Sequence, residues 1–554
     1  MHDLVFRNCL LLDGSGRPAV QGDLAIKDGL ISAVGKAEGP AKQVIDADGL
    51  ALMPGIVDNH THYDAQVTWD PLLSPSGTLG VTTAIIGNCG FTIAPCRPSD
   101  RELVMRNLTQ VEGMSLDVLR RGVRWEFESI PEYLVFLERS RPALNVAAFA
   151  GHSSLRTYVM GEAATERAAT QAEVAEMKRL LLDGMRAGAV GFSTSTSPAH
   201  NGEGGKPMPS RLADEAEMRA LVGALGEAGR GTFMLTKGGH TSIPFLEDLA
   251  AQSGRPVVIA ALLHNSTNPD AVFRDLDEIG NANSRGRKLL GAVSCCPLSM
   301  DFTLHSPYVF EGLKSWQPAL ALKGDAYKRK LGEKPFREGI RAELNQPAHF
   351  RLFNGEWNKV EVVECRNKAF EGRTVDLLSK EQNQHPLDFL LDLALAEDLD
   401  TVFNAMLLNS DEAAVGRMIE HPHSLVSLSD AGAHLTFFND AGFGLHLLGH
   451  WVRRLGVLRI EDAVKKLTRQ PAAVFGIRGR GALVPGWHAD LMLFDPATVD
   501  RGPKRRVFDL PGGQPRLTTP AIGVHGVWVN GVQVARDGAS TGERPGALLR
   551  DFAA

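Results

Sequence analysis

The chain has 554 residues, 59 Lys and Arg against 65 Asp and Glu, and a formal net charge of -6. This length allows a large core with a satellite domain, and the nearly balanced charge gives no electrostatic reason to bind nucleic acid or an anionic membrane. The amino terminus lacks a basic segment followed by a long apolar run, and no stretch is apolar for long enough to span a bilayer. Six cysteines without a CxxC pair are too sparse for a disulfide framework. We therefore expect a soluble, cytoplasmic protein.

The two ends of the chain share one sequence pattern. Residues 3 to about 53 read as short alternating strands with tight turns, and the same pattern returns from roughly residue 480 in "GALVPGWHADLMLFD" and "GVHGVWVNGVQVARDG". We expect residues 1–53 and 481–554 to form one small β-sandwich domain, with the long middle of the chain inserted between its halves.

The middle, residues 54–480, alternates apolar strand-like runs with helical stretches such as 170–188 and 214–229. Eight runs are candidate strands: 55–62, 81–89, 145–152, 189–195, 232–237, 256–264, 288–296 and 424–430. Eight strand–helix units predict an α/β fold, a (β/α)8 TIM-like barrel whose active site lies at the C-terminal ends of the strands. A charged insert at about 297–423 interrupts the pattern, and its size predicts helices of its own and a role as a lid or substrate wall.

Polar side chains gather at the predicted strand ends. In "PGIVDNHTHYD", His60 and His62 are two residues apart, so in a strand their imidazoles point to one side while Thr61 faces away. The strand ends supply seven such residues: His60, His62, Cys89, His152, Lys237, His264 and Asp430. Imidazole, thiolate and carboxylate are the ligands that suit zinc, so a metal site at the barrel mouth is predicted.

Several motifs together carry a family resemblance. "PGIVDNHTHYD", "IIGNCGFTIAP", "AAFAGHSSLR", "GAVGFSTS", "SLSDAGAH" and the closing "VNGVQVARDGASTGERPGALLR" follow one another along the chain. In this order they resemble the D-aminoacylase branch (N-acyl-D-amino-acid deacylases) of the amidohydrolase superfamily. The resemblance covers nearly the whole chain and is weakest across 297–423.

The resemblance implies roles for particular residues. His60 and His62 match the first-strand metal ligands, Cys89 matches a cysteine that replaces a carboxylated lysine on the metal, and His264 falls near the sixth-strand histidine. Asp430 matches the aspartate that binds metal and transfers protons, which makes it a catalytic candidate. His152 matches a motif beside the site and is the second catalytic candidate, either as an oxyanion donor or in support of the ligands.

Strand five departs from the family pattern. Where a metal-binding histidine is expected, the chain reads "FMLTKGGHT", and a protonated lysine has no lone pair to offer a metal. Three alternatives are open: Lys237 is carboxylated and bridges two ions, His240 reaches back toward the site, or Lys237 binds an anionic group of the substrate. The site could thus hold one Zn²⁺ ion or two.

The implied activity is metal-dependent hydrolysis of an N-acylated amino acid, of D or L configuration, through a metal-bound hydroxide. Ser195, Lys237 and His240 are candidates for binding this small-molecule substrate. Two alternatives are a cyclic-amide hydrolase of the hydantoinase kind, against which the fourth strand lacks a lysine, and a metal-binding barrel without catalysis. Barrels of this kind often associate, so a homo-oligomer is among the states considered.

Overall fold

The computed structural model describes residues 1–111, 113–348 and 351–553 and divides the chain into two compact units. The first unit comprises Met1–Leu262, Asp275–Cys295 and the chain from Gly416 to its carboxyl end. The second unit comprises Leu263–Arg274 and Cys296–Val415. Within the described ranges, no helix is both long and apolar enough to cross a membrane.

The centre of the first unit is a curled arrangement of eight parallel strands, which form two sheets. In chain order they are β6 (Ile56–Asp58), β7 (Val81–Ile86), β8 (Asn145–Ala148) continued by β9 (Ala150–Gly151), β10 (Gly191–Ser195), β11 (Thr232–Thr236), β12 (Val257–Leu262), β13 (Leu289–Val293) and β18 (Ser424–Val426). Each strand pairs with its neighbour in parallel. β7 is buried along its whole length, as expected of a parallel strand covered on both faces.

Backbone contacts join the two sheets that make up this arrangement. Beyond β8, the Phe149 amide donates to the Ile86 carbonyl of β7. Thr61 and Ala431, just past β6 and β18, form a parallel bridge, and the Asp430 amide donates to the His60 carbonyl. The segments that follow the first and the last strand therefore lie side by side.

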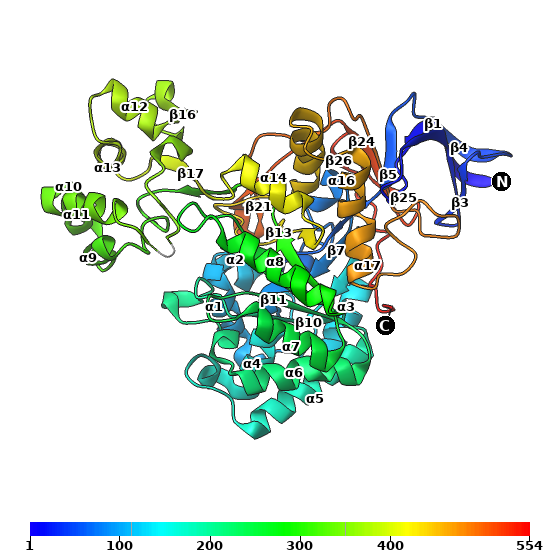
Figure 1. Cartoon of the computed structure of the whole chain (residues 1–554), viewed down its shortest axis with the longest axis horizontal. Helices are drawn as coiled ribbons and strands as arrows, with labels where there is room; N and C mark the ends of the chain where they lie inside the picture. Colours follow the sequence, from blue (N-terminus) through cyan, green and yellow to red (C-terminus); the bar gives the residue numbers. More distant parts are fainter. Residues whose placement is uncertain (112, 349–350, 554) are drawn as a thin grey trace. The chain divides into compact units, whose positions relative to one another are not determined.

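Helices follow most of these strands along the chain. Their bounds are α1 (Arg101–Val111), α2 (Leu116–Gly122), α3 (Ile130–Ser140), α4 (His152–Met160), α5 (Gln171–Ala187), α6 (Glu215–Ala228), α7 (Ile243–Ser253), α8 (Ala271–Ser284), α14 (Glu412–Glu420), α15 (Phe443–His446), α16 (Ile460–Leu467) and α17 (Arg469–Val474). α5 begins with a capping box between Thr170 and Glu173 and ends at Gly188, whose positive φ of 112° suits glycine. α5, α6 and α7 pack side by side (Figure 1).

The observed strands are shorter than the predicted runs, and two of the differences affect predicted site residues. The run 55–62 is a strand only over β6, so both histidines lie just beyond it. The run 145–152 is interrupted at Phe149, and His152 is the first residue of α4, where a strand end was predicted. Hydrophobicity alone does not separate the last strand residue from the first residue of the following turn or helix.

Both ends of the chain contribute to one nine-stranded sheet. Its strands are β1 (His2–Leu11), β2 (Val20–Lys27), β3 (Leu30–Gly35), β4 (Ala41–Asp46), β5 (Ala51–Pro54), β19 (Leu491–Phe494), β24 (Val524–Val529), β25 (Val532–Arg536) and β26 (Ala539–Ser540). β19 pairs antiparallel with β5 on one side and β24 on the other. The rings of Phe6 and Trp528, 4.9 Å apart, pack edge to face in the same core and tie the two ends together.

The second unit has its own sheet, helices and core. Its four strands run in the order β14 (Leu298–Phe302), β17 (Val402–Leu408), β15 (Val360–Glu364) and β16 (Arg373–Thr374). Its helices are α9 (Gln317–Leu320), α10 (Gly324–Gly332), α11 (Lys334–Leu344), α12 (Val375–Glu381) and α13 (Pro386–Ala396) (Figure 1). Phe302, Phe310, Trp316 and Phe403 are buried together in its core. The insert thus carries helices of its own, as its length predicts.

Candidate metal centre

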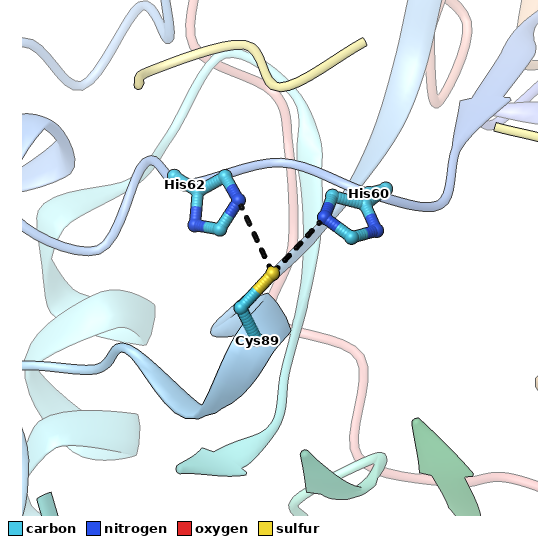
Figure 2. A group of neighbouring side chains, drawn as sticks. All are labelled: His60, His62 and Cys89. Carbon is cyan, nitrogen blue, oxygen red and sulfur yellow. Dashed lines mark hydrogen bonds between the residues drawn. The ribbon is translucent and has the colours of Figure 1, made fainter. Parts of the chain in front are cut away.

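Three side chains that can bind a metal converge at the end of β6. The Cys89 Sγ atom lies 3.4 Å from Nε2 of His60 and 4.0 Å from Nε2 of His62 (Figure 2). The three donor atoms lie within 4.8 Å of one another, and all three residues are buried. Thr61, between the histidines, turns its hydroxyl to the Ile85 carbonyl of the neighbouring strand. The chain is therefore anchored between the two imidazoles.

Cys89 is presented by a strained turn after β7. Gly87, Cys89 and Gly90 all have positive φ, at 81°, 58° and 78°. A side chain at Gly90 would meet the Ser193 carbonyl oxygen at 3.0 Å, so the turn packs too closely against β10 for another residue. The Gly87 amide donates to Asp64. A non-glycine residue held in the left-handed region is costly, and such strain is typical of functional sites.

Asp430 completes the group of donors. Its Oδ1 atom lies 3.3 Å from Nε2 of His60 and 3.7 Å from Nε2 of His62. Burial alone would raise the pKa of Asp430, but the hydrogen bond from His62 and the two neighbouring imidazoles hold it well below its usual range. Asp430 is therefore ionised at neutral pH.

The chemistry of this donor set fits zinc. Burial lowers the pKa of His60 to about 4, so this imidazole is neutral and has a lone pair to donate. Burial raises the pKa of the Cys89 thiol, which makes a thiolate there dependent on a nearby cation. Two imidazoles, one sulfur and one carboxylate are the ligand types that Zn²⁺ prefers, and a bound cation would offset their desolvation.

A small cavity of about 60 Å³ opens onto these donors. Besides His60, His62, Cys89 and Asp430, it is lined by Phe91, His200, Thr236, Ala261, Leu428 and His434. The Thr236 hydroxyl, at the end of β11, lies 3.1 Å from the Cys89 sulfur. Sequence reasoning missed His200 and His434 as site residues. His434 belongs to the quoted "SLSDAGAH", whereas His200 lies five residues beyond β10 with no motif to mark it.

Lys237 points to a different partner. Its Nζ atom lies 3.0 Å from Oδ2 of Asp275 on α8, and its side chain is 18% exposed. Lys237 is not among the residues that line the cavity, which Thr236 reaches instead. His240, three residues further on, is exposed to solvent.

His264 lies at the start of the second unit. Its backbone amide donates to the Asn409 side chain at 2.7 Å, and its carbonyl accepts from the Asn409 amide at 2.9 Å. Both residues belong to the same unit. The role of His264 as a metal ligand stays a prediction.

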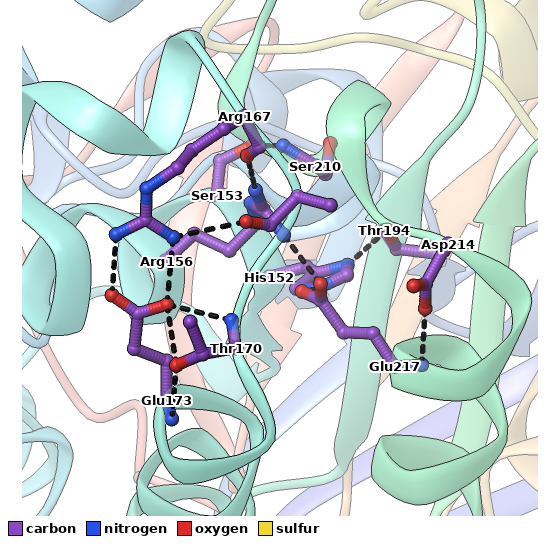
Figure 3. Close-up of polar contacts among 11 residues, drawn as sticks. His152, Ser153, Arg156, Arg167, Thr170, Glu173, Thr194, Ser210, Asp214 and Glu217 are labelled. Carbon is purple, nitrogen blue, oxygen red and sulfur yellow. Dashed lines mark hydrogen bonds and ion pairs between the residues drawn. The ribbon is translucent and has the colours of Figure 1, made fainter.

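His152 belongs to a buried polar network rather than to the cavity (Figure 3). Its Nδ1 atom lies 2.7 Å from the Thr194 hydroxyl and its Nε2 atom 2.8 Å from Glu217. Glu217 also accepts from Arg156 at 2.5 Å. Both ring nitrogens of His152 therefore already have partners, and neither is available to an oxyanion.

The buried ion pair of this network gives a stability prediction. The Arg156 and Glu217 side chains are 0% and 1% exposed, so Glu217→Gln leaves a buried guanidinium without its counterion. We expect the free energy of unfolding, measured from the urea midpoint, to fall by about 3–5 kcal/mol. Glu176→Gln, which breaks an exposed pair with Arg179, is the control and should cost less than about 1 kcal/mol. Equal effects of the two substitutions would contradict the prediction.

The same network predicts a pH dependence. Burial opposes ionisation of Glu217, but His152 and Arg156 hold its pKa below its usual value of 4.5. A carboxyl group whose pKa is lower in the folded state stabilises the fold above the unfolded pKa and loses that contribution as pH falls. The difference in unfolding free energy between wild type and Glu217→Gln should therefore shrink below about pH 4.5.

Ser195 is fully buried at the end of β10. Its hydroxyl oxygen lies 2.7 Å from Nδ1 of His200, and it accepts from the Ser197 amide at 3.1 Å. Ser195 does not itself line the cavity, whereas His200 does.

Comparisons with known proteins identify the family of the chain. A sequence model described as "Amidohydrolase family" matches residues 43–297 and 349–535. The chain is 31% identical to an N-acyl-D-aspartate deacylase of Alcaligenes xylosoxydans xylosoxydans, over 99% of this chain and 95% of the relative. It is 29% identical to a D-aminoacylase of the same organism, over 100% of this chain and 98% of the relative.

A solved structure supports the fold. N-acyl-D-glutamate deacylase from Bordetella bronchiseptica, complexed with zinc and a phosphonate inhibitor that mimics the tetrahedral intermediate, superposes with a TM-score of 0.66. The two sequences are 24% identical, and the match covers 99% of this chain and 100% of the other. The likeness thus extends over both units of the chain.

Proposed function

Because this chain belongs to the amidohydrolase family, we propose that it is a zinc-dependent hydrolase of N-acyl-D-amino acids. The reaction splits the amide bond into a carboxylate and a free D-amino acid. The observation that carries the proposal is the buried group of His60, His62 and Cys89 with Asp430 beside it. The D configuration rests on the relatives, whose names specify D-amino acids.

Zinc binding is assigned to four residues: His60, His62, Cys89 and Asp430. When bound, Zn²⁺ supplies a Lewis acid that lowers the pKa of water to about 7 and polarises a carbonyl group. The residues themselves fix the position of the ion, because the strained turn at Cys89 and the anchored backbone at Thr61 leave the donors little freedom.

Asp430 is assigned the proton transfers. Its carboxylate is ionised at neutral pH and borders the cavity, so it can accept the proton of the attacking water. The leaving amine must gain a proton as the amide bond breaks, and the same carboxyl group can deliver it. His152 is assigned a positioning role, since its ring connects Thr194 on β10 to the Glu217–Arg156 pair.

The wider architecture is proposed to follow the same family. The curled strands with their bridge at Thr61 and Ala431 support a closed (β/α)8 barrel over residues 54–480. The sheet shared by both chain ends supports a small β-sandwich from residues 1–53 and 481–554. All six cysteines are free and buried, which supports a reducing, cytoplasmic location.

The activity can be tested directly with a panel of substrates. Purified protein is assayed with N-acetyl-D-amino acids, their L enantiomers, and hydantoin as the cyclic amide. We expect turnover of the D series that disappears with a chelator and returns with zinc. Turnover of hydantoin alone would favour the cyclic-amide hydrolase, although β10 carries no lysine for a bridging carbamate. No metal-dependent turnover of any substrate would favour a barrel without catalysis.

Lys237 gives a prediction about the number of ions. Its ion pair with Asp275 supports a protonated lysine over a carboxylated one. We therefore expect Lys237→Ala, purified with bicarbonate, to contain as much zinc per chain as the wild type when measured by plasma emission. A loss of zinc in the variant would instead indicate a carboxylated, metal-bound Lys237.

A further inference from the structure

His200 lines the same cavity as the metal-binding residues, yet it is not one of them. The cavity is bordered by His60, His62, Cys89 and Asp430, and His200 contributes to its wall together with Phe91. The rings of His200 and Phe91 pack edge to face, with centroids 4.9 Å apart. His200 lies outside the group of three donors, and its Nδ1 atom is already 2.7 Å from the Ser195 hydroxyl, whereas Asp430 directs its carboxylate to His60 and His62. Its second ring nitrogen, Nε2, is therefore the atom that can contact a molecule in the cavity.

The hydrogen bonds of Ser195 fix the tautomer of His200. The Ser195 hydroxyl is buried, and its oxygen already accepts from the Ser197 amide. Its own hydrogen needs an acceptor, and Nδ1 of His200 at 2.7 Å is the acceptor that the described residues provide. If Nδ1 accepts, the proton of the neutral ring sits on Nε2. The described part of the chain offers Nε2 no hydrogen-bond partner.

The surroundings keep this ring neutral. Burial, aided by the nearby His434 and His62, lowers the pKa of His200 to about 3. A neutral imidazole with its proton on Nε2 is a hydrogen-bond donor that cannot give the proton away at neutral pH. It also adds no positive charge next to the metal ligands, so it does not compete with a cation for their site.

We propose that Nε2–H of His200 donates a hydrogen bond to the acyl carbonyl oxygen of the substrate as that oxygen becomes negative. This inference rests on the proposed amide hydrolysis. The cavity that His200 lines also contains the four metal-binding donors, so the amide group that reacts at these donors lies against the cavity wall. A donor in this wall is therefore placed close to the bond that breaks. A fixed donor of this kind stabilises the transition state without reorganising.

Two substitutions of His200 test its hydrogen-bond donor separately from the shape of its ring. His200→Phe keeps an aromatic ring against Phe91 but removes the donor, and it should lower kcat by about 10²–10³-fold with little change in KM. His200→Gln places an amide N–H near the position of Nε2 and should recover at least about tenfold of that loss. Ser195→Ala removes the hydrogen bond that keeps the proton on Nε2, so both tautomers of His200 become accessible. It should lower kcat less than His200→Phe does. His525→Phe, an exposed histidine on β24, is the control and should leave kcat unchanged.

Binding gives a readout that does not need turnover. A phosphonate in which phosphorus replaces the acyl carbon carries the negative oxygen of the transition state, and calorimetry measures its affinity for the zinc-loaded protein. We expect His200→Phe to weaken this affinity by about the factor lost in kcat, while binding of the product D-amino acid and the zinc content stay the same.

The possible results are distinct. An active His200→Phe with wild-type phosphonate affinity would overturn the inference and leave the proposed function standing. A loss of zinc in both His200 variants would overturn it too, because His200 would then be a metal ligand. A wild-type protein that neither hydrolyses N-acyl-D-amino acids nor binds the phosphonate would overturn the proposed function and this inference with it.

Discussion

Asp430→Asn is expected to lower kcat for an N-acyl-D-amino acid by about 10²–10⁴-fold. The side chain keeps its shape, but an amide can neither accept the proton of the attacking water nor pass one to the leaving nitrogen. Asp430 lies 3.3 Å from His60 and borders the cavity, so no other carboxylate among the residues that line it can take over this role.

The measurement is steady-state kinetics with zinc content determined on the same sample. Asp462→Asn, which breaks an exposed pair with Arg459, is the matched control and should behave as the wild type. If Asp430→Asn retained both its zinc and its wild-type kcat, Asp430 could not be the residue that transfers protons.

Cys89→Ala is expected to reduce both zinc affinity and turnover at least about 100-fold. Removing a residue that only hydrogen-bonds to a metal ligand already lowers metal affinity or activity by about 10–100-fold, and a ligand itself should matter more. The sulfur lies between His60 and His62, and alanine leaves two imidazoles facing an empty position. The measurements are zinc dissociation followed with a chromogenic chelator and the rate of deacylation.

Cys9→Ala provides the control for this substitution. Cys9 is also a free, buried cysteine, but it lies on β1 in the sheet formed by the chain ends. Both substitutions remove one buried sulfur, so any general loss of packing is common to them. Equal zinc affinity in the two variants would show that Cys89 is a packing residue.

The sequence predicted the α/β architecture because buried parallel strands leave a clear apolar signal. All eight predicted runs contain a strand, from Ile56–Asp58 to Ser424–Val426. The family resemblance was confirmed by the comparisons, and it did not depend on strand boundaries. Its motifs also marked His60, His62, Cys89 and Asp430, which the structure brings together.

The rest of the site depends on side-chain orientations that the local sequence pattern does not predict. At the end of β11 two neighbours, Thr236 and Lys237, compete for the cavity, and the alternation of the strand turns Thr236 inward and Lys237 toward Asp275. Hydrophobic periodicity cannot decide between them, since neither is part of the apolar run. The lysine stood out because of its chemistry, and its orientation had to come from the packing of α8.

Local sequence also failed to predict the positions of His152 and His200: the first was expected at the site and lies away from the cavity, and the second was not expected there and lines it. His152 follows a strand and carries a motif, yet the helix that begins there turns it to Glu217. His200 follows a loop and carries no motif, yet the loop returns it to the cavity, where Ser195 holds it. The path of a loop is set by tertiary contacts, and the local sequence pattern does not predict these contacts.

The most direct test of the central claim is a zinc titration of the metal-free protein, with hydrolysis of an N-acetyl-D-amino acid followed at each addition. We expect no activity without zinc, then a linear rise that stops at a whole number of ions per chain, with Cys89→Ala and Asp430→Asn remaining at least about 100-fold less active throughout. Full activity in the metal-free protein, or a rise unaffected by these two substitutions, would contradict the assignment of the catalytic centre to His60, His62, Cys89 and Asp430.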